Sequence, residues 1–204
     1  MVVLNEKNIG VELQRWFSKS ILLTENINFN DVDVFSKVLN EFIFDYKRYY
    51  SRDEQIILSN LILRHELIGI LLYRIARSYF LLGKEDVALV YSLLGTFLSG
   101  FEIYYSAQIG KGLKINHGLG TIIGARVIIG DNALLHQGIT FGDRNGGRPN
   151  ILDNVKVYAG STILGDITVG NNSVIGANSL CIVSVPDNQI FGGNPAKFIK
   201  MNNQ

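Results

Sequence analysis

Only four side chains in this 204-residue chain are of the types that titrate nearest neutral pH: His65, His117, His136 and Cys181. Histidine, with an unperturbed pKa of about 6.5, is well suited to act as a general base. Zinc sites usually draw on several such residues. His117 and His136 could share a zinc ion between subunits, but three histidines make this a minor alternative, and we expect no metal.

The elements that must position these side chains follow a six-residue repeat in the second half of the chain. Aliphatic or similar residues recur at this spacing, with one step of eight and one of ten, at Ile103, Ile109, Ile115, Ile123, Ile129, Leu135, Phe141, Ile151, Val157, Ile163, Val169, Ile175 and Cys181. The pattern predicts short strands joined by tight turns, with the repeated side chains stacked inward between successive coils. Three strands per coil would form a triangular prism, and Cys181 would belong to its core.

The two irregular steps of the repeat are polar and rich in glycine. They fall at residues 116–120, which include His117, and at residues 143–149. Because a solenoid tolerates insertions only at its corners, both segments are predicted to be loops on a rigid scaffold, where functional residues concentrate. His117 is therefore the strongest candidate base on position alone.

The first half of the chain has a different pattern. Apolar residues between 53 and 83 recur at spacings of three and four, which predicts helices, and 18 of the 21 glycines lie from Gly95 onward. We expect roughly four to five helices here. The predicted domains are a helical domain at 1–100 and a β-helix with a C-terminal tail at 101–204. His65 falls in a helix, where a packing or partner-facing role is the simpler interpretation.

Several short motifs carry a family resemblance: RHEL at 64–67, YRI at 73–75, IGKG at 109–112, NHG at 116–118, QGITFG at 137–142 and GNPAK at 193–197. On these motifs, residues 61–200 resemble serine acetyltransferases, which acetylate L-serine with acetyl-CoA. The resemblance implies an α+β protein in which an N-terminal α-helical domain precedes a left-handed parallel β-helix. It also implies a homotrimer with active sites in grooves between subunits.

The resemblance assigns roles to individual residues. His117 matches the general base of the family, and Glu102, fifteen positions earlier, matches the acidic residue that orients the base. Acetyl-CoA, the implied co-substrate, would lie along the coils, near residues predicted to contact it: Gly142, Ala159, Ala177 and Lys197.

At positions near the site, the sequence departs from the family in ways that bear on the acceptor. Asn116 replaces an aspartate, Tyr104 replaces a histidine, and Arg148 stands in a loop that has lost the family's carboxylate-binding histidine. Together with His136, these are the predicted acceptor-binding residues. The departures favour O- or N-acetylation, at a hydroxyl or an amine, of a sugar or sugar nucleotide of surface polysaccharide biosynthesis, with serine as the alternative acceptor.

Composition excludes other functions. A formal net charge of +1 argues against nucleic-acid binding, and a single cysteine suits a reducing compartment. The longest uncharged stretch, 87–101, is too short to span a bilayer, and no signal peptide is apparent, so we expect a cytoplasmic protein. A non-catalytic β-helix scaffold stays a minor alternative, although a scaffold has no need of a base and carboxylate at a loop.

Overall fold

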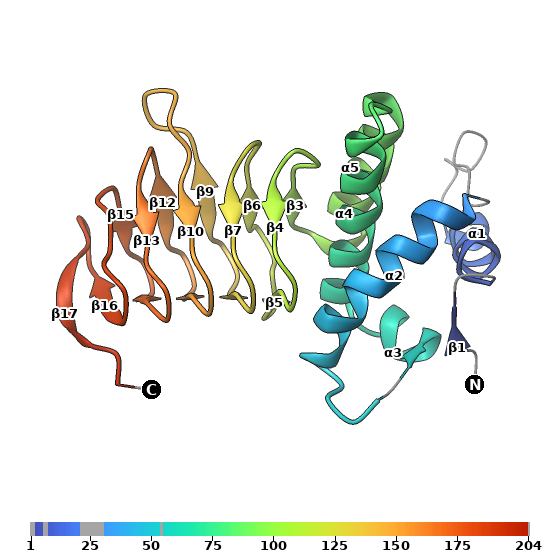
Figure 1. The fold of residues 1–204 in the computed structure, drawn as a ribbon, viewed down its shortest axis with the longest axis horizontal. Coiled ribbons are helices and arrows are strands. Elements are labelled where there is room, and N and C mark those ends of the chain that lie inside the picture. The colour runs from blue at the N-terminus through green and yellow to red at the C-terminus, as the bar shows by residue number, and fades with distance from the viewer. Residues whose placement is uncertain (1–2, 6–7, 21–30, 54, 204) are drawn as a thin grey trace.

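The computed structural model describes residues 3–5, 8–20, 31–53 and 55–203. Helices occupy one end of the molecule and a β-solenoid the other, so that the two termini lie far apart (Figure 1). This order confirms the predicted fold class, although the division into two domains at residue 100 stays a prediction. None of the helices in the described ranges has the length and apolar character needed to cross a membrane.

Five helices lie within the described part of the first half, as the apolar spacing predicted: α1 (Ile9–Ser20), α2 (Val32–Lys47), α3 (Leu58–Ile62), α4 (His65–Leu81) and α5 (Glu85–Ser99). A short antiparallel pair, β1 (Val3–Leu4) with β2 (Ile56–Ile57), joins the start of the chain to the segment before α3. Helix α2 begins where the Asp31 carboxylate accepts a hydrogen bond from the Val34 amide at 3.2 Å. Helix α5 ends at Gly100, whose φ of 73° lies in the left-handed region that favours glycine.

The solenoid begins directly after α5. Its strands are β3 (Glu102–Ile103), β4 (Gln108–Ile109), β5 (Lys114–Ile115), β6 (Ile122–Ile123), β7 (Ile128–Ile129), β8 (Leu134–Leu135), β9 (Thr140–Gly142), β10 (Asn150–Ile151), β11 (Lys156–Val157), β12 (Thr162–Leu164), β13 (Thr168–Val169), β14 (Val174–Ile175), β15 (Leu180–Cys181), β16 (Gln189–Gly192) and β17 (Lys197–Met201). Strands β3 to β16 form three parallel sheets that are the three faces of a prism. The sheets are β3-β6-β9-β12-β15, β4-β7-β10-β13, and β5-β8-β11-β14-β16, to which β17 adds antiparallel.

The repeated residues form the core of this prism. All thirteen predicted inward positions are buried, and none is more than 7% exposed. Cys181, among them, is fully buried, and burial raises the pKa of its thiol. The six-residue pattern is therefore confirmed, including the assignment of Cys181 to the core.

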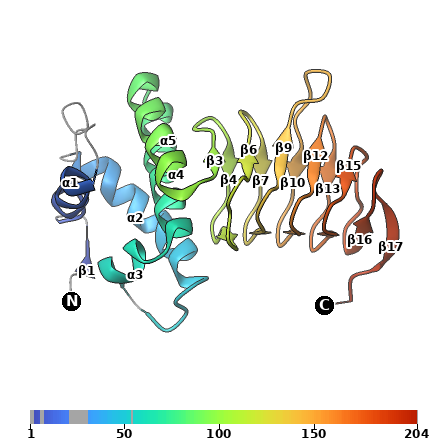
Figure 2. The ribbon, with the colours of Figure 1, turned by 180° about the vertical axis from the view of Figure 1, so that it is seen from behind.

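The open edge of the first coil is covered by side chains from the helices. Arg74 of α4 is buried, pairs with Asp45 of α2 at 3.0 Å, and donates hydrogen bonds to the carbonyls of Ile109 and Gly110 at 2.7 and 2.5 Å. The neighbouring Tyr73 hydroxyl donates to the Ala107 carbonyl at 2.9 Å. Figure 2 shows α4 and α5 beside β3 at this junction. The helical half thus supplies the hydrogen-bond partners that a preceding coil would have supplied.

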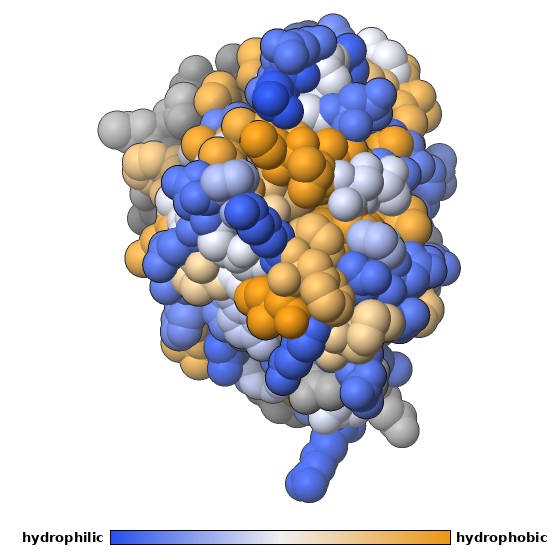
Figure 3. Space-filling view, turned by 90° about the vertical axis from the view of Figure 1, so that its left-hand side faces the viewer, coloured by the Kyte–Doolittle hydropathy of each residue, from blue (hydrophilic) through white to orange (hydrophobic). Residues whose placement is uncertain are grey.

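At the opposite end, β17 folds back along β16 and closes the last coil. Its residues are exposed, and apolar side chains gather on this end of the molecule (Figure 3). They include Phe198, Ile199 and Met201.

Candidate active site

The corner between β5 and β6 carries His117, the candidate base. His117 and Gly118 both have φ of 66°, in the left-handed region. At Gly118, a Cβ atom would lie 2.7 Å from the Phe101 ring and 2.9 Å from Ile115, so no larger residue fits there without a shift. The predicted loop at the first irregular step is therefore a tight turn whose backbone is closely specified.

This corner stacks in register with the corners of the following coils. Ile115 pairs with Leu135, Leu135 with Val157, and Val157 with Ile175. The residues that follow these four strands therefore form two parallel columns. One column is Asn116, His136, Tyr158 and Gly176, and the other is His117, Gln137, Ala159 and Ala177.

Two imidazoles share this corner. The His136 ring stacks on Tyr158 with centroids 4.9 Å apart. Burial, followed by the influence of the nearby His117, lowers the pKa of His136 below its ordinary value. The structure thus brings together His117, His136 and Asn116, while Tyr158 is a site residue that sequence reasoning missed.

Three of the four predicted coenzyme residues line the same corner. Ala159 and Ala177 continue the column of His117. Gly192 lies against Gly176 and pairs with Lys197, so Lys197 stands at the far end of the neighbouring column, which starts at Asn116. Four strand spacings separate Asn116 from Gly192, which corresponds to roughly 19 Å along the solenoid axis.

The other predicted residues lie elsewhere on the β3-β6-β9-β12-β15 sheet. Glu102 opens β3 beside Ile122, and its side chain makes no hydrogen bond to His117 or to any other described residue. Tyr104 follows β3 and Gly142 ends β9, so both lie at the C-terminal ends of the strands of this sheet. His117 precedes β6 and therefore lies at the opposite, N-terminal ends of these strands. Tyr104 donates a hydrogen bond to the Tyr105 hydroxyl at 3.1 Å. The Glu102–His117 pair implied by the resemblance stays a prediction.

Arg148 belongs to the second loop, which projects from the solenoid between β9 and β10 (Figure 1). Its guanidinium pairs with the Asp143 carboxylate and donates to the carbonyls of Ala125 and Gly147 at 3.0 and 3.1 Å. Arg148 is therefore held both by its own loop and by the corner between β6 and β7. A cavity of 480 Å³ lies between this loop and the next coil, lined in part by Asn145 and Asp166.

His65 is a second residue that the sequence did not connect to the site. Its Nε2 atom lies 2.8 Å from the carbonyl oxygen of His117. The helical spacing around His65 predicts that this residue lies on a helix. The spacing does not indicate which loop of the solenoid the helix contacts.

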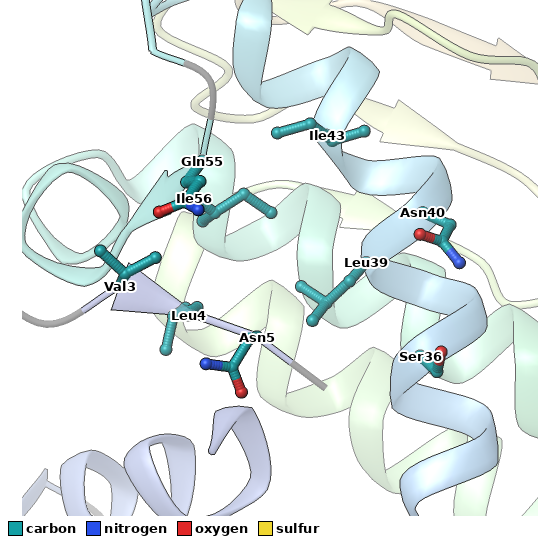
Figure 4. Close-up of a pocket in the computed structure, with 9 residues that line it drawn as sticks. All are labelled: Val3, Leu4, Asn5, Ser36, Leu39, Asn40, Ile43, Gln55 and Ile56. Carbon is teal, nitrogen blue, oxygen red and sulfur yellow. The ribbon is translucent and has the colours of Figure 1, made fainter. Parts of the chain in front are cut away.

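The remaining features of the described residues lie away from this corner. A cavity of 540 Å³ opens between α2 and the β1–β2 pair, with polar groups from Asn40 and Gln55 (Figure 4). None of its lining residues belongs to the solenoid. Among the described residues, no group of three or more histidine, cysteine, aspartate or glutamate side chains could hold a metal ion.

Comparisons with known proteins agree with this architecture. The profile of the bacterial transferase hexapeptide (six repeats) family matches residues 148–182. The serine acetyltransferase of Staphylococcus xylosus is 40% identical over 130 residues, covering 62% of this chain and 60% of the relative. That of Staphylococcus epidermidis is 41% identical over 130 residues, covering 62% and 61%. The match thus spans about three fifths of the length of these curated relatives.

Solved structures extend the likeness to the helical half. Soybean serine acetyltransferase, as the apoenzyme, superposes with a TM-score of 0.81 at 26% identity and covers 95% of this chain and 83% of its own. The Neisseria gonorrhoeae enzyme in complex with serine has a TM-score of 0.76 at 28% identity and covers 92% and 82%. The three-sided parallel solenoid and its six-residue repeats are of the kind seen in left-handed β-helix proteins with hexapeptide repeats. Within that class, the chain is a homologue of the serine acetyltransferases in sequence and in fold.

Proposed function

We propose that this protein is an acetyl-CoA-dependent O-acetyltransferase that acts on L-serine. The observation that carries the proposal is His117, held on a left-handed turn at the head of a column that continues through Gln137 to the small residues Ala159 and Ala177, with Lys197 at the far end of the same corner. The relatives, which are serine acetyltransferases, support serine better than the sugar acceptor that the sequence departures favoured.

In the proposed reaction, His117 removes the proton from the acceptor hydroxyl as its oxygen attacks the thioester carbonyl of acetyl-CoA. A carbon–oxygen bond forms, and the negative charge on the carbonyl oxygen is stabilised by a backbone N–H of a coil. The intermediate then collapses, the carbon–sulfur bond breaks, and the proton on His117 passes to the CoA thiolate. The products are the acetyl ester and CoA, with no acyl-enzyme intermediate.

The complete site would form between subunits of a homotrimer. His117 follows β5 and Lys197 pairs with the end of β16, so both lie at the corner after the β5-β8-β11-β14-β16 sheet, whereas Tyr104 and the loop with Arg148 follow strands of the β3-β6-β9-β12-β15 sheet. One chain cannot place both groups of residues around a single acceptor. In a trimer, a neighbouring copy could supply the second group, so that the site lies between two subunits.

Release of free CoA from acetyl-CoA in the presence of L-serine tests the proposal. Wild-type protein is expected to turn over, and His117→Ala is expected to lower kcat by about a thousandfold or more, because general-base catalysis contributes roughly 10²–10⁴-fold. Coenzyme binding by His117→Ala should be nearly unchanged. An unchanged kcat in this variant would exclude His117 as the base.

A sugar or sugar nucleotide is the second candidate acceptor. It is favoured by one observation: Arg148, the candidate partner for the carboxylate of serine, is already paired with Asp143. Arg148→Ala separates the two acceptors. If Arg148 binds serine in the assembled protein, the variant raises the KM for serine at least tenfold. If a sugar is the acceptor, nucleotide-linked amino sugars or polysaccharide units release CoA faster than serine does.

A further inference from the structure

The N-terminus of α4 contacts the backbone of the corner that carries His117. The Nε2 atom of His65 lies 2.8 Å from the carbonyl oxygen of His117. A carbonyl oxygen only accepts hydrogen bonds, so Nε2 of His65 carries a proton and donates it. On the other side of the ring, Nδ1 lies 3.7 Å from the carboxylate of Glu66, which is buried. The His65 ring is thus held between an acidic side chain and the backbone of the proposed base.

The carbonyl that His65 contacts also accepts a hydrogen bond from the Leu119 amide at 2.8 Å, so His65 is a second donor to it. His117 adopts φ of 66°, a left-handed conformation that seven other described non-glycine residues share and that costs such a residue about 1–2 kcal/mol. The ψ angle of His117 sets the orientation of the peptide group that follows it. A hydrogen bond to the His117 carbonyl therefore restricts this ψ angle, and with it the direction in which the His117 side chain leaves the corner.

The helical half also holds the strand that leads into this corner. The Tyr49 hydroxyl donates to the carbonyl of Ile115 at 2.6 Å and accepts from its amide at 2.8 Å. Beyond the corner, the Gly120 amide donates to the Gly100 carbonyl at 2.9 Å. Between Ile115 and Gly120, His65 provides a further contact, to the backbone of His117 itself.

We propose that His65 is a positioning residue for His117. This proposal rests on the proposed function, in which His117 is the base. It adds that the helical half orients the His117 side chain through one hydrogen-bond donor, Nε2 of His65. His65 does not touch substrate in this arrangement. It lowers the freedom of a strained backbone, and misplacement of a catalytic group by as little as 1 Å can cost about a hundredfold in rate.

Steady-state kinetics on four variants test the proposal. His65→Ala is expected to lower kcat by about tenfold to a hundredfold, with the KM for acetyl-CoA changed by no more than about twofold. His65→Gln keeps an N–H donor of similar reach and is expected to recover most of the lost kcat. Arg77→Ala is the matched control, because Arg77 of the same helix donates to the Ser106 carbonyl at 3.3 Å, in a turn remote from His117. It should retain wild-type kcat, and His117→Ala should be inactive.

A wild-type kcat in His65→Ala would overturn the proposal. Equal losses in His65→Ala and His65→Gln would also overturn it, since the donor would then be irrelevant. All assays are to be run well below the melting temperature of the least stable variant, so that reduced kcat is not a loss of folded protein.

A second readout separates this inference from the proposed activity. The chain has three histidines, so the ring Cε1–H resonances can be assigned by NMR from His65→Ala, His117→Ala and His136→Ala. His65→Ala is expected to shift the His117 resonance, and His65→Gln to return it towards its wild-type position. If wild-type protein releases no CoA with any acceptor, the proposed function fails while this measurement still decides the role of His65. A His117 resonance that His65→Ala leaves in place would refute positioning even in an active enzyme.

Discussion

The two ends of the β-helix are closed by different means. At the first coil, side chains from two helices and from the turn after α2 bind backbone groups of the edge strands: Ser92 at Ile103, Arg74 at Ile109 and Tyr49 at Ile115. At the last coil, the main chain of β17 pairs with β16, and the side chains of β17 are exposed. An open sheet edge must be covered in either case.

The candidate base, His117, lies near the end that is closed by side chains. Main-chain pairing covers an edge with little dependence on the side chains involved. Hydrogen bonds from side chains instead hold individual carbonyl and amide groups in place. His65 adds such a hydrogen bond at the turn of His117, beyond the edge strands. The helical half therefore covers the first coil and also contacts the candidate site. At the other end, β17 contributes Lys197, which pairs with Gly192 at the end of the same corner.

The largest effect is expected where the side-chain cap is charged and buried. Arg74→Ala leaves the Asp45 carboxylate buried without its partner and frees the carbonyls of Ile109 and Gly110. The free energy of unfolding should fall by about 3–5 kcal/mol, as measured by urea denaturation. Arg77→Ala, on the same helix, should lose less than about 1 kcal/mol. Equal losses in the two variants would mean that the buried ion pair has no special part in closing the first coil.

A smaller effect is expected from the neutral cap on β5. Tyr49→Phe removes one hydroxyl that satisfies both the amide and the carbonyl of Ile115, and should lower the free energy of unfolding by about 1–3 kcal/mol. The adjacent Tyr50→Phe is the control, because its hydroxyl makes longer contacts, 3.5 Å to Asn60 and 3.3 Å to Arg64. Denaturation curves in which Tyr50→Phe is the less stable variant would contradict the assignment.

The solenoid was predictable because one physical constraint is repeated along the chain. Each coil must place a side chain inward on three faces, so the six-residue phase identified every strand from β3 to β15. The steps of eight and ten residues correctly located the two loops. The column of His117, Ala159 and Ala177 follows from the same register.

The contacts between the two halves were not predictable in this way. The periodicity of α4 indicates a helix but does not say which loop its first residue meets, so the bond from His65 to His117 had no signal in the sequence. Arg148 and Asp143 lie in an irregular loop without a repeat, and their ion pair depends on how that loop folds against the carbonyl of Ala125. Glu102 carries a family match in sequence, yet one chain gives it no hydrogen bond to His117.

The smallest effect is expected at the far end of the solenoid. Phe198 of β17 is 52% exposed and meets Phe191 edge-on, with ring centroids 6.2 Å apart. Phe198→Ala should therefore lower the free energy of unfolding by only about 0.5–1 kcal/mol, because the main-chain bonds between β16 and β17 do not need the ring. Thermal and urea denaturation beside Arg74→Ala measure the contrast. If Phe198→Ala were as destabilising as Arg74→Ala, the last coil would also depend on a side-chain cap, and the distinction between the two ends would be lost.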